Sequence, residues 1–230
     1  MIAPLRTYAL RGVLWYQGES NAGEADQYQV LLAGLMADWR RQFGVDLPFL
    51  IVQLPNFGAP SPVAASSAWA DLREAQRRTV AADKNAALAV TIDTGEAQDL
   101  HPPNKQAVGA RLARAARHLV HGEPISPSGP RVRTARPNGG QILVSFDDIE
   151  GDLVAYGALR PIGFELCGEA SESCRYVDAA LSGGDVLLEA ANVSATRVRF
   201  CWGDAPVCNL YDKSGLPAGP FQIAIETARR

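Results

Sequence analysis

The residues best suited to chemistry lie in two short polar stretches that are far apart in this 230-residue chain. The first, Gln17-Gly18-Glu19-Ser20-Asn21, ends the apolar run Gly12-Val13-Leu14-Trp15-Tyr16, and the second surrounds His101. Open α/β sheets usually bind their ligands at the carboxyl ends of the strands. We therefore expect both stretches to lie on one functional edge of a sheet.

The sequence Asp99-Leu100-His101 could supply a general base. An imidazole takes a proton from a nucleophile while a neighbouring carboxylate fixes its tautomer, which is the role open to Asp99. The alternative is a histidine that lies beside an acidic residue without any catalytic role. His118 and His121 fall in the last turns of a predicted helix, where a cation complements the helix dipole, so we interpret both as structural.

The residues from Gln17 to Asn21 could form an oxyanion and substrate-binding loop. A neutral amide such as Gln17 can be aimed at developing negative charge, whereas the alternative is a polar loop that caps the following helix. Ser20 is the local candidate for a nucleophile, although it lacks the Gly-x-Ser-x-Gly elbow. His, Cys and Asp residues show no metal-ligand spacing, so we predict neither a metal nor a cofactor.

The elements expected to position these residues alternate between strands and helices. Strands are predicted at residues 11–16, 48–54 and 86–92, and helices at residues 26–43 and 68–82 and after Asn104, a good N-cap. This alternation predicts βα units with a parallel sheet. Asn56 follows the second strand and joins the predicted substrate-binding residues.

The pattern changes after residue 123. A linker rich in Pro and Gly leads to short apolar runs separated by Gly, Asp and Asn, which predicts a small antiparallel β-module. We therefore divide the chain into residues 1–123 and 124–230. Cys167 with Cys174 and Cys201 with Cys208 flank loop-like segments, so two local disulfides in an oxidising compartment are expected; four reduced thiols are the alternative.

The composition excludes several classes of protein. Hydrophobic residues make up 47% of the chain and charged residues 20%, an ordinary globular balance. A net charge of -3 without a basic stripe argues against nucleic acid as a partner. No apolar run is long enough to span a bilayer, so we expect no membrane partner, and the first residues lack the order of a signal peptide.

Several separated motifs resemble the sialate O-acetylesterase family of SGNH-type carbohydrate esterases. They are Trp-Tyr-Gln-Gly-Glu-Ser-Asn, Pro-Phe-Leu-Ile-Val-Gln-Leu-Pro-Asn-Phe, Trp-Ala-Asp-Leu-Arg-Glu-Ala-Gln, Asp-Leu-His-Pro-Pro-Asn-Lys-Gln and a C-terminal segment from Cys208 to Phe221. The resemblance implies a partial three-layer α/β/α sandwich that hydrolyses acetyl esters on sialic acid or other sugars by a serine mechanism without a metal. It also implies a periplasmic or secreted setting.

Carried over by residue, the resemblance makes His101 the catalytic histidine and Gln17 to Asn21 the block that lines the oxyanion site. Asp99 is the nearest acidic partner, although the wider SGNH pattern places the aspartate three residues before the histidine, where this chain has Gln98. The family's nucleophile belongs to a Gly-Gln-Ser-Asn block on the first strand of the sheet, and no such block occurs here.

The chain therefore resembles the C-terminal portion of a larger esterase that lacks the strand bearing the serine. Three explanations are open: a truncated reading frame, association with a part that supplies the missing strand, or recruitment of Ser20. A carbohydrate-binding or self-associating protein and a general short-chain esterase are the competing functions. A homo-oligomer that covers the missing sheet element is the expected assembly.

Overall fold

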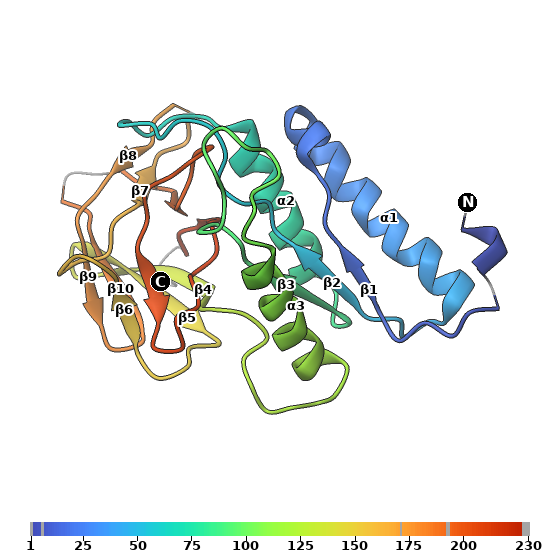
Figure 1. Cartoon of the computed structure of the whole chain (residues 1–230). Coiled ribbons are helices and arrows are strands. Elements are labelled where there is room, and N and C mark those ends of the chain that lie inside the picture. Colours follow the sequence, from blue (N-terminus) through green and yellow to red (C-terminus); the bar gives the residue numbers. More distant parts are fainter. Residues whose placement is uncertain (1, 6, 171, 192–193, 227–230) are drawn as a thin grey trace.

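A small parallel sheet organises the first part of the chain (Figure 1). The computed structural model describes residues 2–5, 7–170, 172–191 and 194–226. The strands β1 (Val13–Trp15), β2 (Phe49–Val52) and β3 (Ala86–Ala89) pair in parallel in the order β1-β2-β3. The 3₁₀ helices η1 (Ala3–Leu5) and η2 (Glu19–Glu24) precede and follow β1. The predicted parallel sheet is confirmed.

Helices cover both faces of this sheet. The helices α1 (Ala25–Phe43) and α2 (Ala68–Ala81) share a core with Phe49 and Ile51, whereas α3 (Lys105–Leu119) packs on Leu50. Successive strand residues point to opposite faces, so β2 serves both layers and is fully buried. Ser67 and Asn104 accept N-cap hydrogen bonds at α2 and α3. In α1, Tyr28 and Leu32 take the core positions, whereas Leu31 is 54% exposed.

The second part of the chain is an antiparallel β-module, as predicted from the short apolar runs. Its strands form three sheets, each held by antiparallel pairing. In sheet order they are β4 (Arg131–Asn138), β5 (Gln141–Asp147), β10 (Asp185–Glu189) and β9 (Ala179–Ser182); β13 (Phe221–Ala224), β11 (Arg197–Phe200), β7 (Phe164–Cys167) and β8 (Arg175–Tyr176); and β12 (Leu210–Asp212) with β6 (Leu153–Ala155).

Two disulfides tie the loops of the β-module. They join Cys167 to Cys174 and Cys201 to Cys208, which confirms the pairing within each predicted couple. No helix among the described residues is long and apolar enough to cross a membrane.

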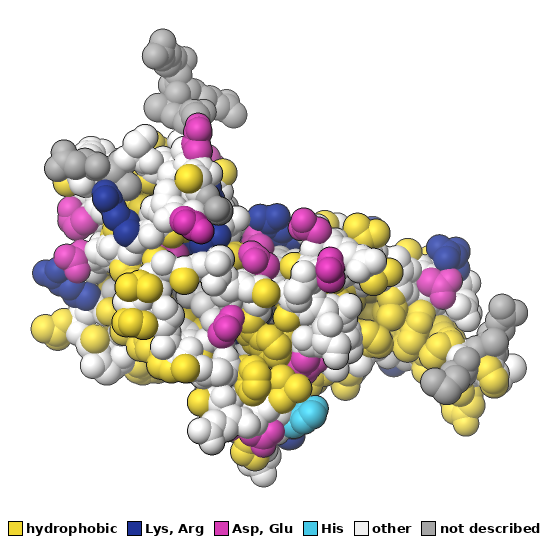
Figure 2. Space-filling view, turned by 90° about the horizontal axis from the view of Figure 1, so that it is seen from above, with side chains coloured by type: hydrophobic (Ala, Val, Ile, Leu, Met, Phe, Trp, Pro, Cys, Tyr) yellow, Lys and Arg dark blue, Asp and Glu magenta, His cyan; other side chains and the backbone are white. Residues whose placement is uncertain are grey.

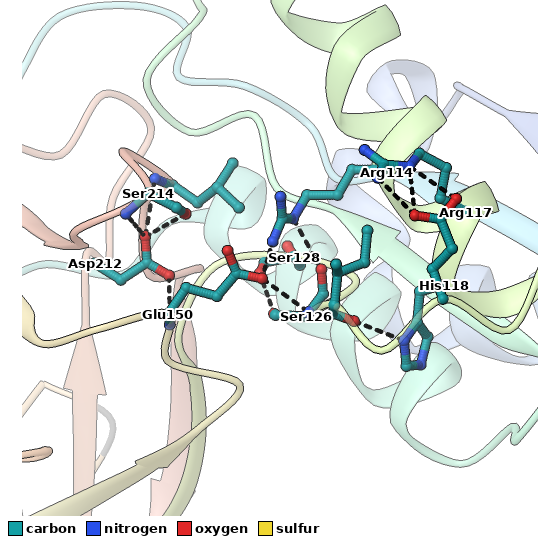
Figure 3. A network of polar contacts seen from close by, with 11 residues as sticks. Arg114, Arg117, His118, Ser126, Ser128, Glu150, Asp212 and Ser214 are labelled. Carbon is teal, nitrogen blue, oxygen red and sulfur yellow. Dashed lines mark hydrogen bonds and ion pairs between the residues drawn. The ribbon is translucent and has the colours of Figure 1, made fainter.

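A polar network joins α3 to the β-module through the linker (Figure 3). The Arg114 guanidinium pairs with Glu150 and donates to the Ser126 carbonyl at 2.8 Å, and the Ser126 amide donates to Glu150 at 3.0 Å. The Glu150 amide in turn donates to Asp212 at 3.1 Å. His118 contacts the Ile125 carbonyl through Nδ1 at 2.7 Å, in agreement with a structural role. Our division of the chain after residue 123 remains a proposal, and these contacts cross it.

A second junction rests on the fully buried side chain of Arg73 in α2. Its guanidinium donates to the carbonyls of Gly203 at 2.9 Å and Asp204 at 2.6 Å in the β-module, and to that of Pro55 at 3.4 Å after β2. Burial lowers the pKa of Arg73 to about 9, and the negative charge of Asp204 partly offsets this by raising it. The group therefore stays cationic at neutral pH. Three chain segments are thereby fixed by one side chain.

Replacement of Arg73 should destabilise the protein strongly. Arg73→Met leaves buried carbonyls without donors, and each such group costs about 1–3 kcal/mol. We expect the free energy of unfolding to fall by about 3 kcal/mol or more, measured by urea denaturation. Arg41→Ala, which removes a guanidinium from an exposed pair with Asp38, should change it by less than about 1 kcal/mol. Equal effects of the two changes would contradict this account of the junction.

Candidate active site

The two polar stretches singled out in the sequence meet in one open pocket of about 440 Å³. Gln17, Glu19 and Ser20 line it from the end of β1, and His101 lines it from the loop before α3. The remaining lining residues are Tyr16, Leu100 and Lys105. The carboxyl edge of the sheet therefore brings a hydroxyl, an imidazole, an amide and charged groups to one place.

Side chains from α1 and α2 hold the backbone at the end of β1. The Gln17 carbonyl accepts hydrogen bonds from the Tyr28 hydroxyl at 2.8 Å and from the Gln76 amide at 3.2 Å. Gly18 has a φ of 151°, and a Cβ there would lie 2.7 Å from Leu72 Cδ2. Only glycine fits this turn without strain, because it combines an unusual backbone angle with close packing on α2. The turn sets the position of the residues that follow.

Ser20 lies in η2, the short helix that leads from β1 into α1, and its side chain is exposed. Beside it, Gln17 donates from Nε2 to Asn21 Oδ1 at 2.9 Å. This bond fixes the Gln17 amide and leaves it a second N–H to donate. The predicted loop is thus a 3₁₀ turn whose polar side chains are ordered next to the pocket.

Local hydrogen bonds shape the loop that carries His101. The Asp99 carboxylate accepts from the His101 backbone amide at 2.8 Å, and no hydrogen bond joins it to the imidazole among the described residues. The Gly95 amide donates to Asn56 Oδ1 at 2.9 Å, and the Gly58 amide donates to the Ala97 carbonyl at 3.1 Å. The loop after β2 therefore holds the histidine loop.

The predicted site residues thus occupy different places. Four of them line the pocket, as described above, whereas Gly18 packs against Leu72 of α2 and Asn21 accepts a hydrogen bond from the pocket residue Gln17. Asp99 bonds the loop backbone. Asn56 lines a separate pocket with Asp93 and Tyr211, and its side-chain oxygen is engaged by Gly95.

Sequence reasoning did not select two further residues of the pocket, Tyr16 and Lys105. The Lys105 ammonium lies 5.2 Å from the centre of the Tyr16 ring, within the range of a cation–π contact. Burial raises the pKa of Tyr16, and the charge of Glu19 adds to this effect. Both residues belong to the motifs quoted for the family resemblance, and this membership was the signal that could have selected them.

One cluster among the described residues has the composition of a metal site, and it lies in the β-module. Glu165, Cys167 and Cys174 place one ligand atom each within 4.8 Å of the others. The two sulfurs are joined in a disulfide, however, and a disulfide sulfur is not a thiolate ligand.

A parallel sheet with helices on both faces defines the first part of the chain as an α/β fold, with a serine and a histidine in one pocket at the carboxyl edge of the sheet. Comparison with known proteins identifies the family. Residues 2–118 match the family model described as carbohydrate esterase, sialic acid-specific acetylesterase. The chain belongs to this family.

Relatives and a solved structure agree with this assignment. The chain is 28% identical to the mouse sialate O-acetylesterase, with 96% of this chain and 46% of the relative covered, and 27% identical to the human one, with 96% and 47% covered. A carbohydrate acetylesterase structure from Xanthomonas citri matches with a TM-score of 0.86 and 38% identity, covering 97% of this chain and 52% of that one. The chain thus spans about half the length of these proteins.

The bond between Asn56 and Gly95 should order the histidine loop. Asn56→Ala removes the acceptor, and a hydrogen bond of this kind is worth about 1 kcal/mol. We expect amide hydrogen exchange at Gly95 to accelerate about fivefold, whereas Asn56→Asp, which keeps an oxygen at this position, should preserve most of the protection. Unchanged exchange in Asn56→Ala would show that other contacts hold the loop.

Proposed function

We propose that this chain hydrolyses acetyl esters on sialic acid or other sugars by a serine-esterase mechanism. The observation that carries the proposal is the pocket shared by Ser20 and His101. Membership of the sialic acid-specific acetylesterase family supports the substrate class.

In the proposed first step, Ser20 Oγ attacks the acetyl carbonyl while its proton passes to His101. The tetrahedral intermediate collapses, the bond to the sugar oxygen breaks, and the imidazolium returns the proton to the departing alcohol. A water molecule then attacks the acetyl-serine in the same way, releases acetate and restores the serine. Each proton that leaves a nucleophile thus reaches a leaving oxygen through His101.

The other predicted residues support these steps in the proposal. The free N–H of Gln17 and the backbone at Gly18 are candidates to stabilise the oxyanion. Hydrogen bonds to the Gln17 side chain and to the Gln17 carbonyl fix the positions of both groups. Glu19 lines the pocket, and Asn21 orients the Gln17 amide by accepting its hydrogen bond. Asp99 acts as a positioning residue through the His101 backbone, and Asn56 through Gly95.

We propose an oxidising setting, periplasmic or secreted, for this activity. The two disulfides support it, since such bonds form and persist mainly outside the cytosol.

We also propose that a second copy of the chain covers the edge of the parallel sheet. β1 is an edge strand of this sheet, and its Leu14 is 63% exposed. Figure 2 shows hydrophobic side chains gathered at the end of the molecule that carries α1 and β1. An unpaired edge with apolar neighbours favours self-association.

Sedimentation at micromolar concentration should therefore detect a dimer. Leu14→Asp should shift the protein to monomer, since it places a charge on the proposed contact without disturbing the core. A monomeric unmodified chain would remove this proposal.

Loss of Ser20 or His101 should abolish hydrolysis of a neutral aryl acetate. Each change removes a reacting group, and such groups contribute about 100-fold or more. The exposed residues Ser66 and His121 offer matched controls, and Ser66→Ala and His121→Ala should leave the rate unchanged. Near-normal turnover in Ser20→Ala would exclude Ser20 as nucleophile, and near-normal turnover in His101→Ala would refute the site. Absence of turnover in the unmodified chain, with retained sugar binding, would instead indicate a binding protein.

A further inference from the structure

A second pocket, of about 280 Å³, lies where the two parts of the chain meet and has no role in the proposed mechanism. The end of α2 and the strand β3 line it, together with the linker, the start of β4 and the residues just before β13. It shares no lining residue with the pocket of Ser20 and His101. Ligand sites occur preferentially at such junctions.

The lining of this pocket is mostly apolar. Apolar side chains come from each of the segments that form it, among them Val80, Leu88, Val132, Pro127, Pro130 and Pro220. Proline has no N–H and a fixed φ, so the three prolines present rigid apolar rings without backbone donors. The pocket therefore favours an apolar ligand, because burial of apolar surface lowers the free energy.

The volume of the pocket limits the size of that ligand. A water molecule, which has one non-hydrogen atom, takes up about 30 Å³ in the liquid. At about 280 Å³, the pocket has room for a ligand of about nine or ten non-hydrogen atoms. It is thus suited to a small molecule, and it is too small for a peptide strand.

One backbone donor is unpaired at the edge of the pocket. β3 is an edge strand, and its partner in the sheet is β2. The carbonyls of Asn85 and Ala89 accept hydrogen bonds from the β2 side, and successive residues of a strand face alternate sides, so the Leu88 N–H and carbonyl point away from β2. No hydrogen bond beyond the β2 pairing involves the Leu88 main chain in the described part of the protein. Because Leu88 lines the pocket, a ligand oxygen there can accept from its N–H.

The charges around the pocket leave one cation uncompensated, Lys84. The other charged lining residues form ion pairs, which are Asp83 with Arg40, Asp148 with Arg131, and Arg77 with Glu74. Lys84 is exposed and has no ion pair within 4.0 Å among the described residues. The ammonium and the Leu88 N–H are both donors, and a carboxylate is an acceptor for both.

We propose that this pocket binds a small carboxylic acid with an unbranched apolar chain of about eight carbons, the class to which octanoate belongs. The chain fills the apolar interior, and the carboxylate accepts hydrogen bonds from the Leu88 N–H and the Lys84 ammonium. The ligand contacts both parts of the chain. This inference goes beyond the proposed esterase function and does not depend on it.

Calorimetric titration with octanoate and with octan-1-ol, its neutral counterpart, tests the recognition of the charge. Octanoate should bind the unmodified chain about five- to tenfold more tightly, since only the acid carries a charge for Lys84. Lys84→Gln should weaken octanoate binding about three- to fivefold and leave octan-1-ol binding unchanged. Lys84→Arg should retain the preference for the acid.

A variant that fills the pocket tests the position of the ligand. Ala81 is the exposed last residue of α2 and lines the pocket, so Ala81→Trp should weaken both ligands about tenfold or more without disturbing the core. Ala37→Trp, at an exposed position of α1 outside the pocket, is the matched control and should change neither affinity. In NMR spectra, octanoate should shift the Leu88 amide resonance and leave that of His101 in place.

Absence of octanoate binding, or equal affinity for acid and alcohol, would overturn the proposal. Unchanged octanoate binding in Lys84→Gln would also overturn it, as would a shift at His101 without one at Leu88, because the acid would then lie in the other pocket. Octanoate binding with these properties in a chain that hydrolyses no ester would support this proposal and count against the esterase proposal alone.

Discussion

The need to satisfy one buried guanidinium constrains the arrangement of the whole molecule. Arg73 has no contact with solvent, so its two terminal NH2 groups find acceptors within the protein, whereas Nε has no hydrogen-bond partner among the described residues. The acceptors are main-chain carbonyls from two distant segments, the loop after β2 and the loop closed by Cys201 and Cys208. An ion pair between two mobile side chains would not fix the backbone so directly.

This constraint extends to the candidate active site through a short series of contacts. Asp204, held by Arg73, accepts from the Phe57 amide at 3.1 Å and from the Ser67 hydroxyl at 2.5 Å. The loop after β2 is thereby fixed to the β-module, and its Asn56 holds Gly95 in the loop that leads to His101. The β-module thus does more than follow the α/β part, since it supports the loop that supports the histidine.

The sequence predicted the regular elements well because their signals are local. Apolar runs bounded by turn residues gave the three strands of the parallel sheet, and Asn104 marked the start of α3. The cysteine pairs were predictable since each joins residues seven apart across a loop.

Contacts between distant segments were not predictable in this way. Asn56 resembled a ligand-binding residue because it follows a strand, but its partner Gly95 is 39 positions away. Arg73 gave no signal, since an arginine in an amphipathic helix is usually exposed and its acceptors lie 130 and 131 residues further on. The placement of Lys105 in the pocket could not be predicted either, because it requires knowing that α3 begins beside the end of β1. Its relation to Tyr16 appears only in three dimensions.

The central claim is that Ser20 and His101 form a reactive pair, and covalent labelling tests it most directly. An alkyl fluorophosphonate reacts with activated serines, and mass spectrometry locates the modified residue. The account predicts a single adduct on Ser20 that disappears in His101→Ala. An adduct on another serine, or none at all in the folded chain, would contradict the claim.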